Sequence, residues 1–229
     1  IDTLRILPPP ASGDEEGETS NEPSLGVESG GMHSAEALLL ARYFMFSQVY
    51  FHHIRRIYDI HLKDFLLDWL EQGKFSTEAD EFLLFTDVEI TSALRRAASD
   101  TSQPGNKHAE RIIKRKHFKV VYERNSDDIK KNVGVPVASL LKEPIEKEFG
   151  KENVRIDIYP AKGGILDFPV QDRSGKIVSS FSVSQVLNRL PDVAVDYIFV
   201  DSDIKEDAKK WIDVNKDNII NAFKEGEEQ

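Results

Sequence analysis

The sequence contains no cysteine, and it lacks several short motifs by which nucleotide sites and catalytic centres are often recognised. Without cysteine, disulfides and thiolate chemistry are excluded, which fits a reducing cytoplasm. There is no GxxxxGK[ST] loop, no GxGxxG turn, no HExxH pair and no GxSxG elbow. The pattern therefore does not indicate a P-loop, a dinucleotide fold, a zinc protease or a serine hydrolase. The first residues also lack the basic and apolar regions of a secretory signal, so we expect a cytoplasmic protein.

A net basic charge is also missing. The 40 acidic residues outnumber the 30 Lys and Arg and give a formal charge of −10. This balance argues against a general nucleic-acid binder and against a membrane-surface protein. The apolar run at residues 34–54 is long enough to cross a bilayer, but it carries several side chains that would be costly in hydrocarbon: Glu36, Arg42, Gln48, His52 and His53. We therefore expect no membrane segment.

Composition divides the chain into three segments. Residues 1–32 contain seven acids against one base, few apolar side chains and much Gly and Ser, which predicts a disordered acidic linker. Residues 33–103 predict a helical part, and residues 104–229 mix helical and strand patterns. The Pro104-Gly105 pair lies at the boundary. The predicted fold is mainly α, with a helical half followed by a smaller α+β lobe.

The helical part is organised around residues 34–72, which contain no Pro and no Gly. We interpret this stretch as one long helix or two helices joined end to end. Arg42, Met45, Phe46 and Tyr50 recur at the spacing of a single helical stripe, and the opposite side is apolar as well. A helix that is apolar nearly all round is usually buried, so we expect this one to need packing partners.

The second half carries a basic stretch and regular strand patterns. Residues 107–124 hold seven bases against two acids, which suits either a solvated helix face or a phosphate site. We predict helices at 136–149 and 203–225, strands at 154–159 and 193–200, and a hairpin around Asp172-Arg173-Ser174-Gly175.

The run ARYFMFSQVYFHH, in which Arg42 is followed eight residues later by Tyr50 and then by His52, resembles the HD-domain deoxynucleoside triphosphate triphosphohydrolases. These enzymes cleave a dNTP to a deoxynucleoside and triphosphate. The resemblance implies that Arg42 pairs with substrate phosphate and that Tyr50 lies against the deoxyribose. Both side chains suit those tasks, since a guanidinium matches phosphate oxygens and a phenol offers a flat wall.

The same resemblance implies a regulatory nucleotide site between subunits, with His52 and His53 at matching positions. A second run, AERIIKRKHFKVVYE, is similar to the segment that supplies basic residues to that site. There Lys119 keeps the positive charge of the family, whereas Glu123 reverses it. The family's habit of assembling through this region makes a homo-oligomer the expected state.

The family's divalent metal (Mn, Mg, Fe or Zn) is held by a His, a His-Asp pair and a further Asp, but this chain has no His-Asp dipeptide. The resemblance implies that those ligands lie upstream and that this chain is the C-terminal portion of such an enzyme. A local site built from His52, His53, Asp59 and His61 has poor spacing. We therefore predict no metal ligand and no catalytic residue here.

Two functions stay open. The chain is either part of a dNTP hydrolase or a non-catalytic nucleotide-binding or oligomerisation module. Arg42 and Tyr50 also have a purely structural alternative, a buried salt bridge and a core tyrosine.

Overall fold

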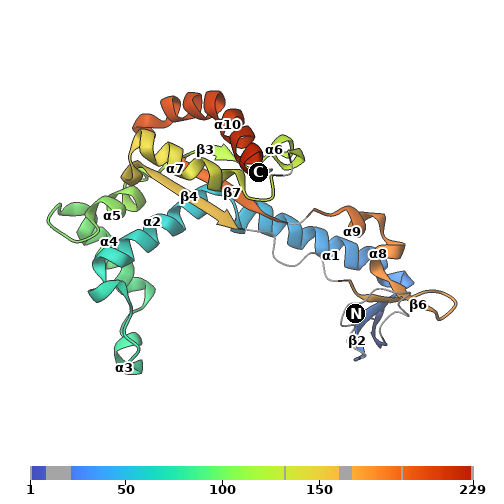
Figure 1. Cartoon of the computed structure of the whole chain (residues 1–229). Helices are drawn as coiled ribbons and strands as arrows, with labels where there is room; N and C mark the ends of the chain where they lie inside the picture. Colours follow the sequence, from blue (N-terminus) through green and yellow to red (C-terminus); the bar gives the residue numbers. More distant parts are fainter. Residues whose placement is uncertain (1, 9–21, 132, 160–166, 192, 228–229) are drawn as a thin grey trace. The chain divides into compact units, whose positions relative to one another are not determined.

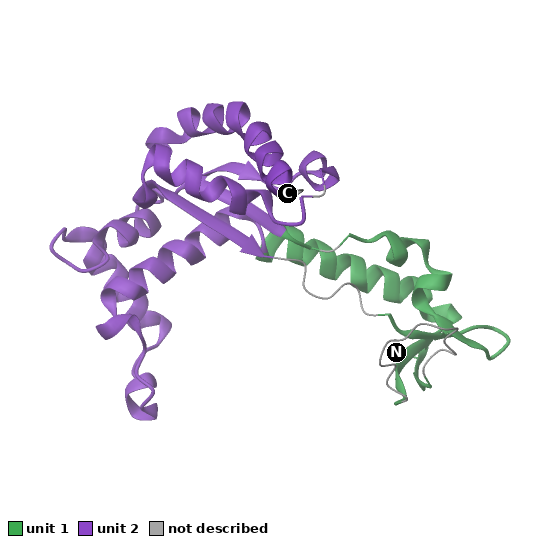
Figure 2. Ribbon diagram, in the orientation of Figure 1, with its two compact units in different colours: residues 1–50, 160–194 green, residues 51–159, 195–229 purple. Residues whose placement is uncertain are grey.

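The structure is a computed structural model, and it describes residues 2–8, 22–131, 133–159, 167–191 and 193–227. The chain forms two compact units, each built from segments that are distant in sequence (Figure 2). Unit 1 comprises Ile1–Tyr50 and Pro160–Ala194, and unit 2 comprises Phe51–Tyr159 and Val195–Gln229. Helices predominate over the sheets, which confirms the predicted mainly α class with a smaller α+β part.

Unit 1 packs one long helix against a small sheet. The strands are β1 (Leu4–Leu7), β2 (Ser24–Glu28), β5 (Pro169–Gln171) and β6 (Ile177–Ser179), paired in the order β1-β2-β5-β6. Only β2 and β5 run parallel. The helices are α1 (Met32–Met45), α8 (Ser180–Val183) and α9 (Gln185–Arg189). Val27, Met32, Val170 and Leu187 form the core between sheet and helices.

Unit 2 contains a three-stranded antiparallel sheet with helices on both faces (Figure 1). Its order is β3 (Lys119–Glu123), β7 (Val195–Val200) and β4 (Val154–Tyr159). The helices α7 (Val137–Phe149) and α10 (Lys205–Glu227) cover one face, where Leu141, Ile145, Ile198 and Ile212 are buried. The helix α2 (His53–Trp69) lies on the other face, held there by Arg56 and Asp157.

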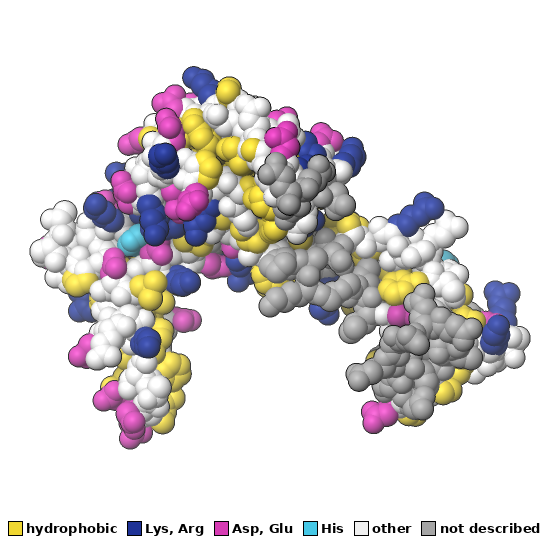
Figure 3. Space-filling model, in the orientation of Figure 1, with side chains coloured by type: hydrophobic (Ala, Val, Ile, Leu, Met, Phe, Trp, Pro, Cys, Tyr) yellow, Lys and Arg dark blue, Asp and Glu magenta, His cyan; other side chains and the backbone are white. Residues whose placement is uncertain are grey.

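Two shorter helices extend this unit away from the sheet. The helices α4 (Asp87–Ser99) and α5 (Asn106–Ile113) pack on α2 around Phe65, Leu94 and Ala109. Thr86 and Glu89 form a capping box that starts α4. A short helix α3 (Ala79–Phe82) precedes it, and a five-residue helix α6 (Ser126–Lys130) follows β3. Several apolar side chains of α3 and the start of α4 are exposed: Phe82, Leu83, Leu84 and Val88. Figure 3 shows hydrophobic atoms gathered along this part of unit 2.

Most predicted elements are confirmed in place, including the helix at 136–149, the strands of unit 2, the hairpin and the last helix. The 34–72 stretch is two helices rather than one. A π-helical turn η2 (Phe46–Tyr50) follows α1, and His52 then caps α2 by accepting a hydrogen bond from the Ile54 N–H.

The predicted disorder of residues 1–32 is wrong for two described segments, Leu4–Leu7 and Ser24–Glu28. Residues 9–21 lie outside the described residues, whereas β1 and β2 on either side are paired strands. The three-segment division of the chain stays a prediction. No helix among the described residues has both the length and the apolar character needed to cross a bilayer.

Candidate functional site

Arg42 and Tyr50 border one shallow hollow on unit 1. Its volume is about 530 Å³, and its walls come from α1 and the π-helical turn: Leu38, Ala41, Arg42, Met45, Phe46 and Tyr50. The Arg42 guanidinium carbon lies 5.3 Å from the centre of the Phe46 ring, and the Phe46 and Tyr50 rings are 5.3 Å apart. The predicted spacing of eight residues therefore does bring the two side chains to one surface.

Neither Arg42 nor Tyr50 is buried, as a purely structural role in a salt bridge or a core would require. Tyr50 is 41% exposed, Arg42 is exposed, and Arg42 has no ion-pair partner among the described residues. In the described residues, therefore, neither side chain is buried as that alternative requires. The apolar side chains beside them are open as well: Leu38, Phe44, Met45 and Val49. The expectation that this helix is buried is thus not met, because only Met32 of α1 is buried.

The other sequence-predicted residues gather in unit 2, where α2 begins beside β3. The rings of His52 and His53 stack 4.4 Å apart, and His53 meets Tyr197 of β7 edge to face. Lys119 Nζ lies 3.3 Å from His117 Nε2. His52, His53 and Lys119 therefore share one region of unit 2, together with His117, which the sequence analysis did not single out.

The surroundings lower the pKa of two of these histidines, His53 and His117. Burial, then the charges of His52 and Glu123, set the pKa of His53, which is lowered on balance. Burial and the neighbouring Lys119 lower the pKa of His117. Glu123 accepts a hydrogen bond from the Tyr197 hydroxyl at 3.4 Å, so its carboxylate already has a partner. Among His52, His53, His117 and Lys119, the lysine carries the positive charge that can attract an anion.

A cluster that sequence analysis missed lies further along α2. Ligand atoms of His61, Asp64 and His108 lie within 4.8 Å of one another, close enough for a metal ion. His61 and Asp64 are three residues apart on one helix, and this spacing is the signal that was available. His108 comes from α5, a position that only the packing of α5 on α2 could reveal.

This cluster does not fit a divalent cation, although His61 Nδ1 is buried without a hydrogen-bond partner among the described residues. Asp64 Oδ2 accepts a hydrogen bond of 2.8 Å from Arg155 Nε. His61 Nε2 accepts from the Phe118 N–H at 3.2 Å, so in the neutral ring Nδ1 carries the proton and offers no lone pair. Two guanidinium groups, those of Arg111 and Arg155, also raise the cost of placing a cation here. The cluster is better described as a hydrogen-bonded contact between helices and sheet.

Comparison with known proteins gives a consistent context. A family model described as "HD associated region" matches residues 18–199. A solved structure of a hypothetical protein from Aquifex aeolicus is 28% identical, with a TM-score of 0.65, over 84% of this chain and 47% of its own. A phosphohydrolase from Bacteroides thetaiotaomicron is 20% identical, with a TM-score of 0.52, over 77% and 52%. The chain therefore spans about half the length of these two structures. No curated protein matches it.

Proposed function

The chain belongs to the family of HD-associated regions, and from this premise we propose that it is the C-terminal part of an HD-superfamily phosphohydrolase that cleaves dNTPs to deoxynucleoside and triphosphate. Its share of the work is substrate contact. The observation that carries the proposal is the hollow where an exposed, unpaired Arg42 lies beside Tyr50.

The side chains of this hollow suit a deoxynucleotide. The guanidinium of Arg42 can donate two parallel hydrogen bonds to phosphate oxygens, which a lysine at the same place could not. Tyr50 follows Arg42 by about two helical turns and offers a ring face and a hydroxyl. A sugar packed against that ring has little space for a 2′-hydroxyl, and this favours dNTP over NTP.

The metal ligands belong to residues outside this chain in this proposal. Among the described residues only the His61 cluster brings three candidate ligands together, and its His61 Nε2 and Asp64 Oδ2 atoms already accept hydrogen bonds. The exposed apolar face of α1 is consistent with a protein in which further chain covers it, because contiguous exposed apolar surface commonly marks an interface. The divalent metal would neutralise phosphate charge and activate water.

Calorimetry on the purified chain tests the proposal. Manganese is titrated first, and dGTP or GTP is then titrated in its presence. We expect no tight metal binding, no triphosphate release, and weak dGTP binding that Arg42→Ala reduces by about tenfold, the effect of losing one charged hydrogen bond. Arg189→Ala removes an exposed cation of the same unit and serves as the matched control. Tight manganese binding with hydrolysis would overturn the assignment of the ligands, and equal binding by Arg42→Ala would overturn the substrate role.

Tyr50 has its own test in the same experiment. Tyr50→Ala removes the wall against the sugar, so the ratio of dGTP to GTP affinity falls toward one. Tyr50→Phe keeps the ring and is expected to keep most of the discrimination. If both variants discriminate as the wild type does, Tyr50 does not contact the sugar.

The group formed by His52, His53 and Lys119 is the proposed regulatory nucleotide site. Lys119 is the one fixed cation of this group, the pKa of His53 is lowered, and the Glu123 carboxylate opposes an anion, so we expect an anionic effector to bind here with low affinity. Lys119→Gln is expected to remove the effect of an added nucleotide on dGTP binding while leaving basal binding unchanged. Unchanged coupling would exclude this role.

The protein is also proposed to assemble as a homo-oligomer. Exposed apolar side chains on α1 provide surface that a second copy can cover, and so do those around α3, which Figure 3 shows. Light scattering over a range of protein concentrations measures the mass directly. A monomer at every concentration, with and without dGTP, would rule the assembly out.

A further inference from the structure

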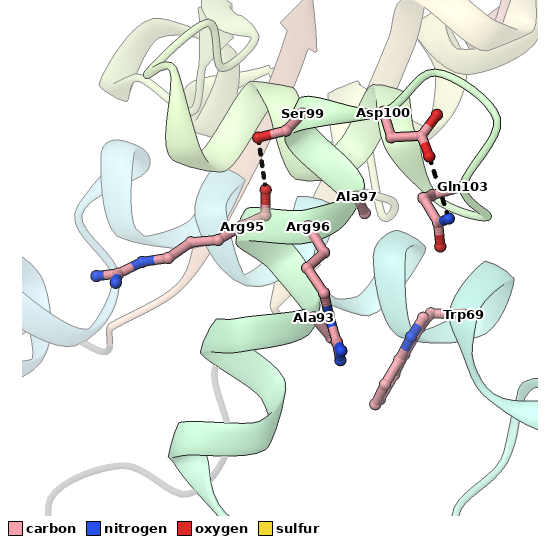
Figure 4. A pocket seen from close by; sticks show the side chains of 8 residues that line it. All are labelled: Trp69, Ala93, Arg95, Arg96, Ala97, Ser99, Asp100 and Gln103. Atoms are coloured by element: carbon pink, nitrogen blue, oxygen red, sulfur yellow. Dashed lines mark hydrogen bonds between the residues drawn. The ribbon is translucent and has the colours of Figure 1, made fainter.

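A second hollow lies within unit 2, where α4 ends beside the last turn of α2 (Figure 4). Its volume is about 710 Å³, within the range of small-ligand sites. Trp69 comes from α2, and the other side chains that border it come from α4 and the turn that follows: Ala93, Arg95, Arg96, Ala97, Ser99, Asp100 and Gln103. None of them belongs to the sites described above.

Two cations border this hollow without a carboxylate partner. Arg95 and Arg96 are exposed, and neither forms an ion pair with any residue that the structure describes. In Figure 4 Arg96 extends toward the side of α4 where Trp69 lies, whereas Arg95 extends away from it. In a chain with a formal charge of −10, two adjacent unpaired arginines are a local exception that favours an anionic ligand.

Trp69 supplies an aromatic wall that is already held in place. Its ring stacks on the buried Phe65 with centroids 5.8 Å apart, and Phe85 meets it edge to face at 6.0 Å. The ring is half-buried, so part of it remains open at the hollow. A preorganised ring loses little entropy on binding, and stacking of a base on such a ring contributes about 1–3 kcal/mol.

The polar end of the hollow carries a carboxylate, that of Asp100. Asp100 is bonded to the Ser102 N–H and hydroxyl and to the Gln103 amide. The hydrogen bond from the Ser102 hydroxyl lowers the pKa of Asp100, so its carboxylate stays ionised. That charge repels phosphate but suits the N–H groups of a base or the hydroxyl of a sugar. The phosphate end and the base end of a ligand are thereby distinguished.

We propose that this hollow binds a nucleoside phosphate, with the base against Trp69 near Asp100 and the phosphates on Arg96. Arg95 lies at the rim and adds long-range attraction only. A bare phosphate would lack the ring contact, and a nucleoside would lack the charge contact. The ligand is a single nucleotide rather than a nucleic-acid strand, because the acidic chain offers one ring and no continuing basic track here.

Tryptophan fluorescence can report this site alone. The sequence has two tryptophans, and the second, Trp211, packs on Phe149 near the sheet. In a Trp211→Phe background, dGTP is expected to quench Trp69 with a saturating curve. Deoxyguanosine should bind at least tenfold more weakly, and inorganic triphosphate should compete with dGTP without quenching.

Matched variants decide the assignment. Arg96→Gln is expected to weaken dGTP quenching by about tenfold, and Arg95→Gln by about twofold to threefold. Lys210→Gln on α10 removes an exposed cation elsewhere in unit 2 and should leave the curve unchanged. Circular dichroism on each variant verifies folding.

Three outcomes would overturn the proposal. The first is the lack of saturable quenching at millimolar dGTP. The second is quenching that Arg96→Gln leaves unchanged. The third is tighter binding of a short single-stranded oligonucleotide than of dGTP. The site and the Arg42 hollow fail independently, because each has its own arginine variant and only one contains a tryptophan.

Discussion

The buried His61 predicts a pH dependence of stability that can be calculated in advance. The side chain is fully buried, and its Nε2 accepts the Phe118 N–H. Burial is the main cause that lowers the pKa of His61 to about 3, and electrostatic interaction with Arg111, His108, Arg155 and His117 lowers it further. The unfolded chain has a histidine pKa of about 6.5.

The sign follows from where the proton binds. Below pH 6.5 His61 binds a proton in the unfolded chain but not in the folded chain. Acid therefore favours unfolding until the pH approaches the folded pKa of about 3. Between pH 7 and pH 5 this linkage removes about 2 kcal/mol from the free energy of unfolding. Above pH 7 neither state binds this proton, so the free energy of unfolding is not reduced by it.

Urea denaturation at pH 7 and pH 5, followed by tryptophan fluorescence, measures this loss, since both tryptophans belong to unit 2. His61→Gln keeps an acceptor for the Phe118 N–H but does not titrate. The wild type should lose about 2 kcal/mol more than the variant on acidification, while the shared contributions of the other histidines cancel. His61→Asn provides a second amide. Equal losses in all three proteins would refute the reasoning and show that His61 is protonated in the folded state.

Three further outcomes follow from the packing of unit 2, each measured by urea denaturation. Gly105→Ala is expected to lower the free energy of unfolding by about 2–4 kcal/mol, because φ is +70° and the new Cβ would lie 2.7 Å from a Phe65 ring carbon. Gly134→Ala is the matched control: its φ is +78°, but nothing lies near the new Cβ, so only the backbone strain of about 1–2 kcal/mol is expected. Arg56→Met alone should cost about 2–3 kcal/mol by stranding the nearly buried Asp157, and adding Asp157→Asn should restore part of the loss; no recovery would show that the pair is not coupled. Burial raises the pKa of Asp128, but hydrogen bonds from Lys216, Tyr122 and Asn125 outweigh it and the pKa is lowered, so this stabilisation is present above about pH 4 and lost below it; Asp128→Asn should flatten that acid limb.

Local patterns in the sequence were sufficient for most elements. The alternation of residues 154–159 and the turn residues at 172–175 depend on near neighbours only, and both predictions are confirmed. The shared surface of Arg42 and Tyr50 was predictable for the same reason, because eight residues on a helix set their separation.

Features that depend on distant contacts were not predictable. The parallel pairing of β2 with β5 joins Val27 to Val170, and no local period announces it. The cluster at His61 needs His108 from another helix, and the hollow at Trp69 needs Arg96 from α4. The roles of Arg42 and Lys119, the metal, the oligomeric state and the cytoplasmic location stay predictions.

The central position of β7 in its sheet affects how the chain folds during synthesis. It is the last strand of its sheet in the sequence, yet within the described part of the chain β3 and β4 each pair with β7 and not with each other. During synthesis these two strands therefore emerge and wait with unpaired edges until Val195–Val200 follows. Contacts of such long sequence separation form slowly, and exposed strand edges invite association. We therefore expect chains that end before β7 to associate more readily than chains that include it.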